Sequence, residues 1–128
     1  MPILLDTHIL LWFLLDSPRL GKRAREILEK SGGRVFFSPV SILEVAIKHA
    51  LKPEVMPCDP DGVLEDALGS GLRELPFTAV HARQVGGLPW LHRDPFDRML
   101  LAQARAEGVL LVTCDEPLLR YGEGVLKG

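Results

Sequence analysis

Short apolar segments alternate with helical segments along this chain, and this alternation constrains its fold more than any other feature. Predicted strands lie at residues 2–5, 34–37 and 109–113, with a possible further strand at 72–76. Amphipathic or capped segments between them predict helices. Strands that alternate with helices are parallel and joined by right-handed crossovers. We therefore predict an α/β fold, a three-layer αβα sandwich around a central, mostly parallel sheet of about four to five strands.

Capping residues mark where several helices begin. Ser38-Pro39 and Asp94-Pro95 each place a capping side chain before a proline that fits the first helical turn. The predicted helices span residues 7–15, 20–30, 39–51, 61–68, 78–85 and 95–107. The longest predicted loops are 52–60 and 86–93, and the second of them carries Trp90 and His92.

Length, composition and charge narrow the class of protein. A chain of 128 residues that is 47% hydrophobic can bury one core, so we predict a single domain over 1–128. Its two cysteines are far apart, which argues against a disulfide scaffold and favours the cytoplasm. No signal peptide is apparent, and the apolar run at 9–15 is too short to span a membrane. A net charge of −2 argues against a protein that coats nucleic acid.

Four acidic residues occupy positions where the presence of a carboxylate requires a specific explanation. Asp6 and Asp115 directly follow predicted strands, at the sheet edge where open α/β folds bind ligands. Glu44 and Asp97 lie on or beside the apolar faces of their predicted helices. A carboxylate directed at a core is costly unless it is paired or binds a metal. Oxygen ligands without a histidine set favour Mg²⁺ or Mn²⁺ over zinc.

Each of these acids also has a purely structural interpretation. Asp94 fits a helix cap better than a metal ligand, and Asp97 fits the third position of the same capped turn. Asp6 can cap the helix that follows it, and Asp115 can open a turn before Pro117. Glu44 has the weakest structural alternative, because Lys48 is its one nearby partner. Periodicity alone does not show whether the four acids converge.

The motifs that carry these acids resemble those of PIN domains, and most closely the VapC-type toxins of toxin–antitoxin pairs. The resemblance covers nearly the whole chain, and its most specific part is the run from His92 to Arg98. The segments that carry it are Leu4 to His8, Ser38 to Glu44, His92 to Ala104 and Leu111 to Asp115. It implies a Mg²⁺- or Mn²⁺-dependent endoribonuclease that acts on RNA, forms a homodimer and is blocked by a cognate antitoxin protein.

The resemblance also implies roles for individual residues. The catalytic and metal-binding acids it implies are Asp6, Glu44, Asp97 and Asp115, with Asp94 as a further possible ligand. Thr113 matches a small hydroxyl residue that is usual before the last acid, whereas Cys114 departs from the polar residue common there. The substrate-binding residues expected on this interpretation are Thr113, Arg93, Arg98 and His92. Trp90 is expected to pack on the core.

The run Ile9 to Leu15 is apolar around the whole circumference of its predicted helix. One face can pack on the sheet, and the rest needs a cover. A second subunit or an antitoxin is one candidate for the cover, and another helix of the same chain is the other.

Two other functions remain open from the sequence. One is a PIN- or flap-type nuclease that acts on DNA or in RNA maturation, whose acids would look the same. The other is a catalytically degenerate binding module, which would be expected to have lost one or more of the four acids. All four are present.

Overall fold

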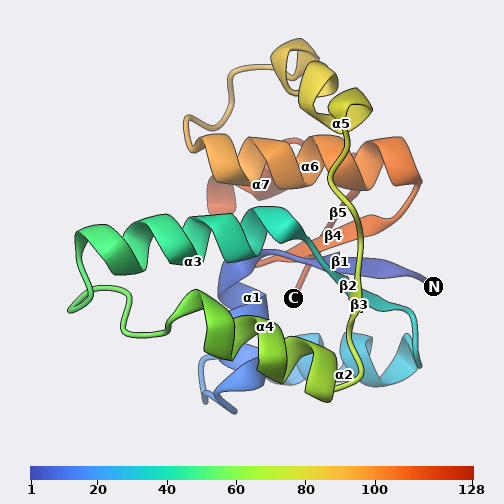
Figure 1. Ribbon diagram of the computed structural model, residues 1–128. Coiled ribbons are helices and arrows are strands. Elements are labelled where there is room, and N and C mark those ends of the chain that lie inside the picture. The colour runs from blue at the N-terminus through green and yellow to red at the C-terminus, as the bar shows by residue number, and fades with distance from the viewer.

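The computed structural model describes residues 1–128, and it contains five strands and seven α-helices (Figure 1). The strands are β1 (Ile3–Leu5), β2 (Val35–Phe37), β3 (Arg73–Glu74), β4 (Leu110–Thr113) and β5 (Val125–Lys127). The helices are α1 (Thr7–Leu14), α2 (Lys22–Lys30), α3 (Pro39–Leu51), α4 (Pro60–Gly69), α5 (Ala79–Gln84), α6 (Pro95–Glu107) and α7 (Glu116–Leu119), with a 3₁₀ turn at Val85–Gly87. All five strands are parallel, in the order β3-β2-β1-β4-β5. The predicted αβα sandwich is confirmed.

Alternate residues of β1 point to opposite faces of the sheet, as the two-residue period of a strand requires. Ile3 and Leu5 pack with apolar residues of α1, α2 and α4. Leu4 packs with residues of α6 and α7 on the other face. Helix α3 contributes to both clusters, through Val45 and Val40 respectively. Figure 1 shows these two helical layers on either side of the sheet.

The edges of the sheet differ from the sequence prediction. Strand β3 has only two residues, both exposed, where a longer strand was predicted at 72–76. Strand β5 was not predicted at all, because its residues are only partly buried and give no alternating apolar pattern. It forms by pairing with β4, so that Thr113 lies opposite Lys127. Short edge strands of this kind limit unwanted pairing with other chains.

The apolar run of α1 is covered mostly by the chain itself. Ile9, Leu10 and Leu11 are buried, and the following three residues are half-buried against the same core. Only Leu15, at the end of the run, is largely exposed. Of the two covers considered from the sequence, helices and strands of the same chain therefore account for most of this surface. No helix in the structure has the length and apolar character needed to cross a membrane.

Candidate active site

Two of the four predicted acids meet because β1 and β4 are neighbours in the sheet. Asp6 follows β1 and Asp115 lies two residues after the end of β4, so both stand at the carboxyl edge. Thr113 joins them: its hydroxyl donates to the Asp6 carboxylate and accepts the backbone N–H of Asp115 at 2.9 Å. Thr113 is fully buried, so in this structure it orients the acids and does not face a substrate.

Both strand-end acids also cap helices. Asp6 Oδ1 accepts the backbone N–H of Ile9 at 2.8 Å, at the start of α1. Asp115 Oδ2 accepts the N–H of Leu118 at 3.0 Å, at the start of α7. The capping interpretation of these residues is therefore realised together with their place at the sheet edge. Asp94 is the cap of α6, as predicted, and accepts the N–H of Phe96 at 2.9 Å.

The two helical acids come from α3 and α6, which pack against each other. The Glu44 side chain is 3% exposed, and its Oε2 lies 2.5 Å from Lys48 Nζ, the predicted partner. Its other oxygen, Oε1, is buried without a hydrogen-bond partner. Asp97 is 15% exposed and caps nothing. Neither carboxylate accepts a hydrogen bond from a backbone N–H group, so the backbone does not stabilise their ionised forms.

Electrostatics show that the acids converge on Asp97. Burial raises the pKa of Asp97 to about 8, and so do the negative charges of the acids around it, Asp94, Asp6, Asp115 and Glu44. Burial also raises the pKa of Asp6 to about 6, although the hydrogen bonds from Thr113 and Ile9 oppose this rise. The structure therefore brings together all four acids that the sequence singled out, with Asp94 beside them.

His92 is the site residue whose role sequence reasoning missed. It was expected to contact RNA, but its Nε2 lies 2.9 Å from an oxygen of Asp97 and 2.9 Å from an oxygen of Asp115. Its Nδ1 accepts the backbone N–H of Asp94 at 3.1 Å. In a neutral imidazole the proton is then on Nε2, which lies between the two carboxylates without pointing squarely at either. Its place two residues before the helix cap is the only local signal of this contact.

Arg98 does not occupy the place expected of a phosphate-binding residue. It is 2% exposed, and its guanidinium donates to the carbonyl oxygens of Pro89, Val85 and Leu88. It also packs against Trp90, with Cζ 4.0 Å from the ring centroid. Arg98 thus holds the loop that carries His92. Trp90 is 77% exposed, so the prediction that it packs on the core is wrong. Arg93 is exposed and remains free to meet a substrate.

The donor set fits a hard divalent cation. The four acids supply carboxylate oxygens, and one of these oxygens is buried without a partner. An oxygen of Asp97, an oxygen of Asp115 and a nitrogen of His92 lie within 4.8 Å of one another. The proton on Nε2 leaves the acids as the available ligands, and all-oxygen sites favour Mg²⁺ or Mn²⁺. The cysteines are free and not part of this group.

Comparison with known proteins agrees with this architecture. The model of the PIN domain family matches residues 3–124. A comparison with curated proteins finds no match. Among solved structures, VapBC2 of Rickettsia felis bound to a promoter DNA fragment has a TM-score of 0.66 at 19% identity, covering 100% of this chain and 98% of that one.

Two further structures are similar to the same degree. A toxin–antitoxin complex from Klebsiella pneumoniae has a TM-score of 0.66 at 19% identity, covering 97% of this chain and 95% of the other. DNA-bound VapBC from Salmonella typhimurium has a TM-score of 0.65 at 21% identity, covering 100% and 97%. At these identities the structural likeness concerns the fold, whereas the family match extends over nearly the whole sequence. The chain belongs to the PIN-domain family.

Proposed function

We propose that this protein is a divalent-metal-dependent endoribonuclease, the VapC-type toxin of a type II toxin–antitoxin pair. The observation that carries the proposal is the convergence of four carboxylates at the carboxyl edge of a parallel sheet. Burial, together with the like charges gathered in this way, raises the pKa of Asp97 to about 8. A bound Mg²⁺ or Mn²⁺ relieves that repulsion, because it attracts the ionised form of every acid around it.

The residues of the site have different roles in the proposed hydrolysis of a phosphodiester bond. Asp6, Glu44, Asp97 and Asp115 would hold the cation, directly or through water, and Asp94 stays mainly a helix cap. When bound, the cation supplies Lewis-acid polarisation of a phosphoryl oxygen and an activated water. Thr113 fixes the Asp6 carboxylate and the turn that carries Asp115. Arg93, exposed beside the site, is placed to meet a substrate phosphate.

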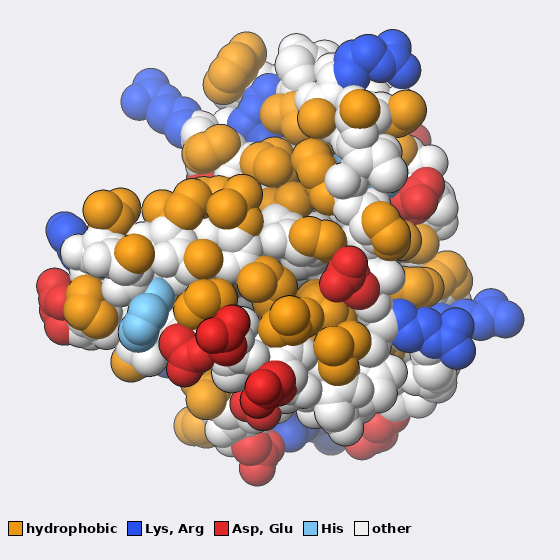
Figure 2. All heavy atoms as spheres, in the orientation of Figure 1, with side chains coloured by type: hydrophobic (Ala, Val, Ile, Leu, Met, Phe, Trp, Pro, Cys, Tyr) orange, Lys and Arg blue, Asp and Glu red, His pale blue; other side chains and the backbone are white.

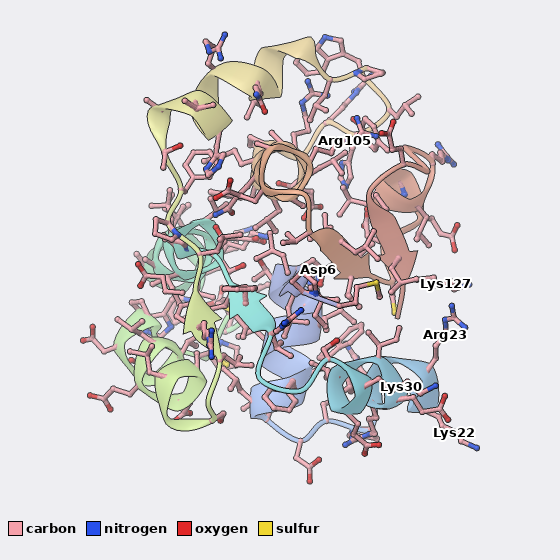
Figure 3. The ribbon with its side chains drawn as sticks, turned by 90° about the vertical axis from the view of Figure 1, so that its right-hand side faces the viewer. Asp6, Lys22, Arg23, Lys30, Arg105 and Lys127 are labelled. Carbon is pink, nitrogen blue, oxygen red and sulfur yellow. The ribbon has the colours of Figure 1, made fainter.

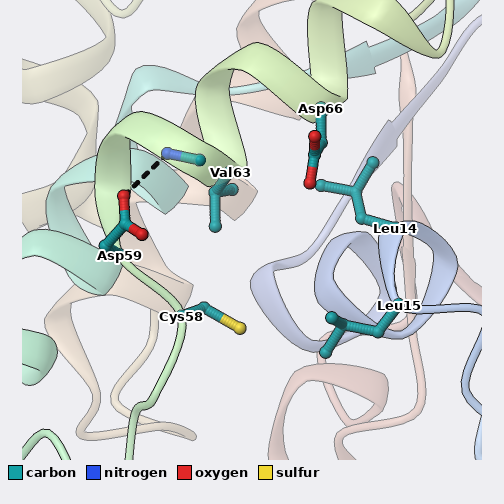
Figure 4. Close-up of a pocket in the computed structure, with 7 residues that line it drawn as sticks. Leu14, Leu15, Cys58, Asp59, Val63 and Asp66 are labelled. Carbon is teal, nitrogen blue, oxygen red and sulfur yellow. Dashed lines mark hydrogen bonds between the residues drawn. The ribbon is translucent and has the colours of Figure 1, made fainter.

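The protein partner we propose is a cognate antitoxin, because VapBC and other toxin–antitoxin complexes are among the structures that share this fold. A cleft between α1 and α4 offers it a docking point (Figure 4). Leu14, Leu15 and Val63 line this cleft together with the acidic residues Asp59 and Asp66. An antitoxin segment with an apolar side chain next to a basic one would complement it. We place the pair in the cytoplasm.

We also propose that the protein is a homodimer that uses the exposed apolar face of α3. Leu43, Ile47 and Leu51 follow one another at four-residue spacing and are 46%, 40% and 76% exposed. Val80 of α5 is also exposed. Figure 2 shows hydrophobic side chains gathered over this face. Ile47→Glu should convert the dimer to a monomer in analytical ultracentrifugation, and an unmodified protein that sediments as a monomer would rule out the dimer.

The test of the nuclease is cleavage of a labelled pool of structured RNA, with Mg²⁺ or Mn²⁺ against EDTA. Asp6→Asn and Asp97→Asn should each lower the rate by at least about a hundredfold, because a bound metal contributes several kcal/mol to transition-state stabilisation. The matched control is Asp61→Asn, which changes an exposed acid in the first turn of α4. Cutting that persists in EDTA would contradict the metal dependence, and no cutting by a folded protein would favour the degenerate module. A DNA panel would test the DNA nuclease.

A further inference from the structure

A cleft next to the acidic site is lined partly by residues that are not among the proposed cation ligands. It has a volume of about 250 Å³, and the residues around it are Asp6, His8, Trp12, Arg19, Cys114 and Asp115. Two of these, Asp6 and Asp115, belong to the acidic site. Whatever occupies the cleft therefore lies directly next to the reacting phosphate of the proposed nuclease.

One wall of the cleft is aromatic. His8 and Trp12 are one turn apart on α1, and their ring centroids lie 5.9 Å apart with a 39° tilt. His8 is exposed and Trp12 is half-buried, so the pair presents ring surface from a packed helix. Because Trp12 also contacts the core, its ring is held in place before a ligand arrives. A fixed aromatic ring beside an open cleft suits a planar group that stacks.

Another lining residue, Cys114, connects the cleft to exposed cations. Cys114 Sγ donates to the carbonyl oxygen of Gly128 at 3.2 Å, and Gly128 follows Lys127 at the end of β5. Arg23 Nε donates to the carbonyl oxygen of Lys127 at 2.9 Å. Figure 3 shows Lys22, Arg23 and Lys127 projecting from the same side of the molecule. Burial and the charge of Asp6 raise the pKa of Cys114, and Lys127 is the cation close enough to oppose them.

We propose that this cleft binds one unpaired RNA base next to the cut phosphate, stacked on Trp12, while Arg23 and Lys127 hold phosphates of the same strand. The proposal rests on the nuclease function proposed above and narrows its substrate to single-stranded segments. A base inside a duplex is stacked on its neighbours and is not available to an aromatic side chain. The cleft is also smaller than the roughly 300–1,000 Å³ typical of drug-sized ligand sites, which suits one base and not a base pair.

The other tryptophan is not placed for this role. One face of Trp90 is covered by the guanidinium of Arg98. Trp90 lies in the loop that leads through His92 into α6.

The cations near Trp12 matter more for RNA binding in this protein than they would in a basic one, because the chain has a net charge of −2. Local positive charge beside the cleft offsets the repulsion between RNA and the acids.

The first experiment measures the fluorescence of Trp12. In a Trp90→Phe, Asp97→Asn double variant, Trp12 is the one remaining tryptophan and cleavage is blocked. The probes are a short oligouridylate and the same oligomer annealed to oligoadenylate. We expect the single strand to quench Trp12 fluorescence and to bind at least about tenfold more tightly than the duplex, as the loss of one stacked base implies. Equal quenching by the duplex overturns the proposal.

The second experiment separates stacking from charge, using anisotropy of labelled single-stranded RNA. Trp12→Phe keeps an aromatic ring and should bind nearly as well as tryptophan, whereas Trp12→Leu keeps the apolar contact and should bind about tenfold more weakly. Arg23→Ala and Lys127→Ala should each lower the slope of log affinity against log salt by about 0.7. Lys30→Ala, a lysine at the other end of α2, is the control that leaves the slope unchanged.

The outcomes distinguish this subsite from the nuclease activity itself. Suppose that the unmodified protein cuts RNA and that a folded Trp12→Leu variant binds and cuts RNA equally well. The proposed subsite is then wrong, and the proposed nuclease activity stands. If Trp12 is quenched by single-stranded RNA but no RNA is cut with either metal, the subsite stands and the nuclease is wrong. If single-stranded DNA quenches Trp12 as much as single-stranded RNA does, the stacking site is supported but does not prefer RNA over DNA.

Discussion

The two acids at strand ends and the two acids within helices do the same chemical work but are held in different ways. Asp6 and Asp115 accept backbone N–H groups of the helices they begin, so each carboxylate is part of the fold. Glu44 and Asp97 bond no backbone group: one oxygen of Glu44 is buried without a partner, and burial raises the pKa of Asp97 to about 8. The first pair therefore stabilises the protein whether or not a cation binds. The second pair caps no helix, and its position is explained by the site.

The largest expected effect is the pH dependence of stability, which comes from the helical acid Asp97. Its pKa is about 8 in the folded protein against an ordinary value of 3.8, so between these values the folded state binds more protons than the unfolded state. In EDTA the free energy of unfolding should therefore fall as pH rises from about 4 to about 8, by at most about 1.4 kcal/mol per pH unit for this one group. Asp6 adds a smaller fall that ends near its own pKa of about 6.

Urea unfolding at pH 5 and pH 8 measures this effect. Asp97→Asn should flatten the dependence above pH 6, and Mg²⁺ should stabilise the unmodified protein more at pH 8 than at pH 5, because it competes with protons. If Asp97→Asn leaves the pH dependence of the free energy of unfolding unchanged, a group other than Asp97 is responsible for it.

The next effect is the loss of a helix cap, which should be confined to the strand-end acids. Asp115→Ala should lower the free energy of unfolding by about 1 kcal/mol, and Asp6→Ala by about 2 kcal/mol because the buried Thr113 hydroxyl also loses its acceptor. Asp6→Asn, which can still cap, is the matched control. Asp97→Asn should not destabilise the protein at pH 7. Equal losses at Asp97 and Asp115 would remove the distinction between the two pairs.

A smaller effect is expected at His92, which connects the two pairs through Asp97 and Asp115. His92→Ala should lower kcat about tenfold with little change in KM, because the carboxylates lose the imidazole that lies between them and helps to position them. Calorimetry of Mn²⁺ binding should show less loss of affinity than in Asp97→Asn. His49→Ala removes an imidazole that bonds the carbonyl of Met56 instead, and serves as the control. A loss of affinity as large as that of Asp97→Asn would make His92 a ligand.

The smallest expected effect is at Lys48, which partly compensates the other helical acid. Lys48→Met keeps the apolar stem and removes the charge, and it should lower stability by up to about 1 kcal/mol because the lysine is 38% exposed. The effect should largely disappear in a Glu44→Gln background, and a double-mutant cycle measures this coupling. Additive effects of the two substitutions would show that the ion pair contributes nothing to stability.

The sequence predicted the strands β1, β2 and β4, most helix starts and the four acids, because these depend on a few neighbouring residues. Caps such as Asp94 and Ser38 are visible from local spacing. Strand β5 was missed, because its pairing with β4 is what makes it a strand. Arg98 was misjudged for a related reason: no local pattern distinguishes an arginine that binds backbone carbonyls of a loop from one that faces solvent.

By itself, the sequence determined the αβα architecture and the positions of acids along the chain, since hydrophobic periodicity and capping act over a few residues. Only the tertiary structure decided that the acids share one site, because this depends on β1 lying beside β4 and on α3 packing against α6. It also decided that His92 lies between two of the acids and that the apolar surface left exposed is on α3, while most of α1 is covered. Burial and proximity are properties of the packed chain, and they set the charge interactions on which the proposed chemistry depends.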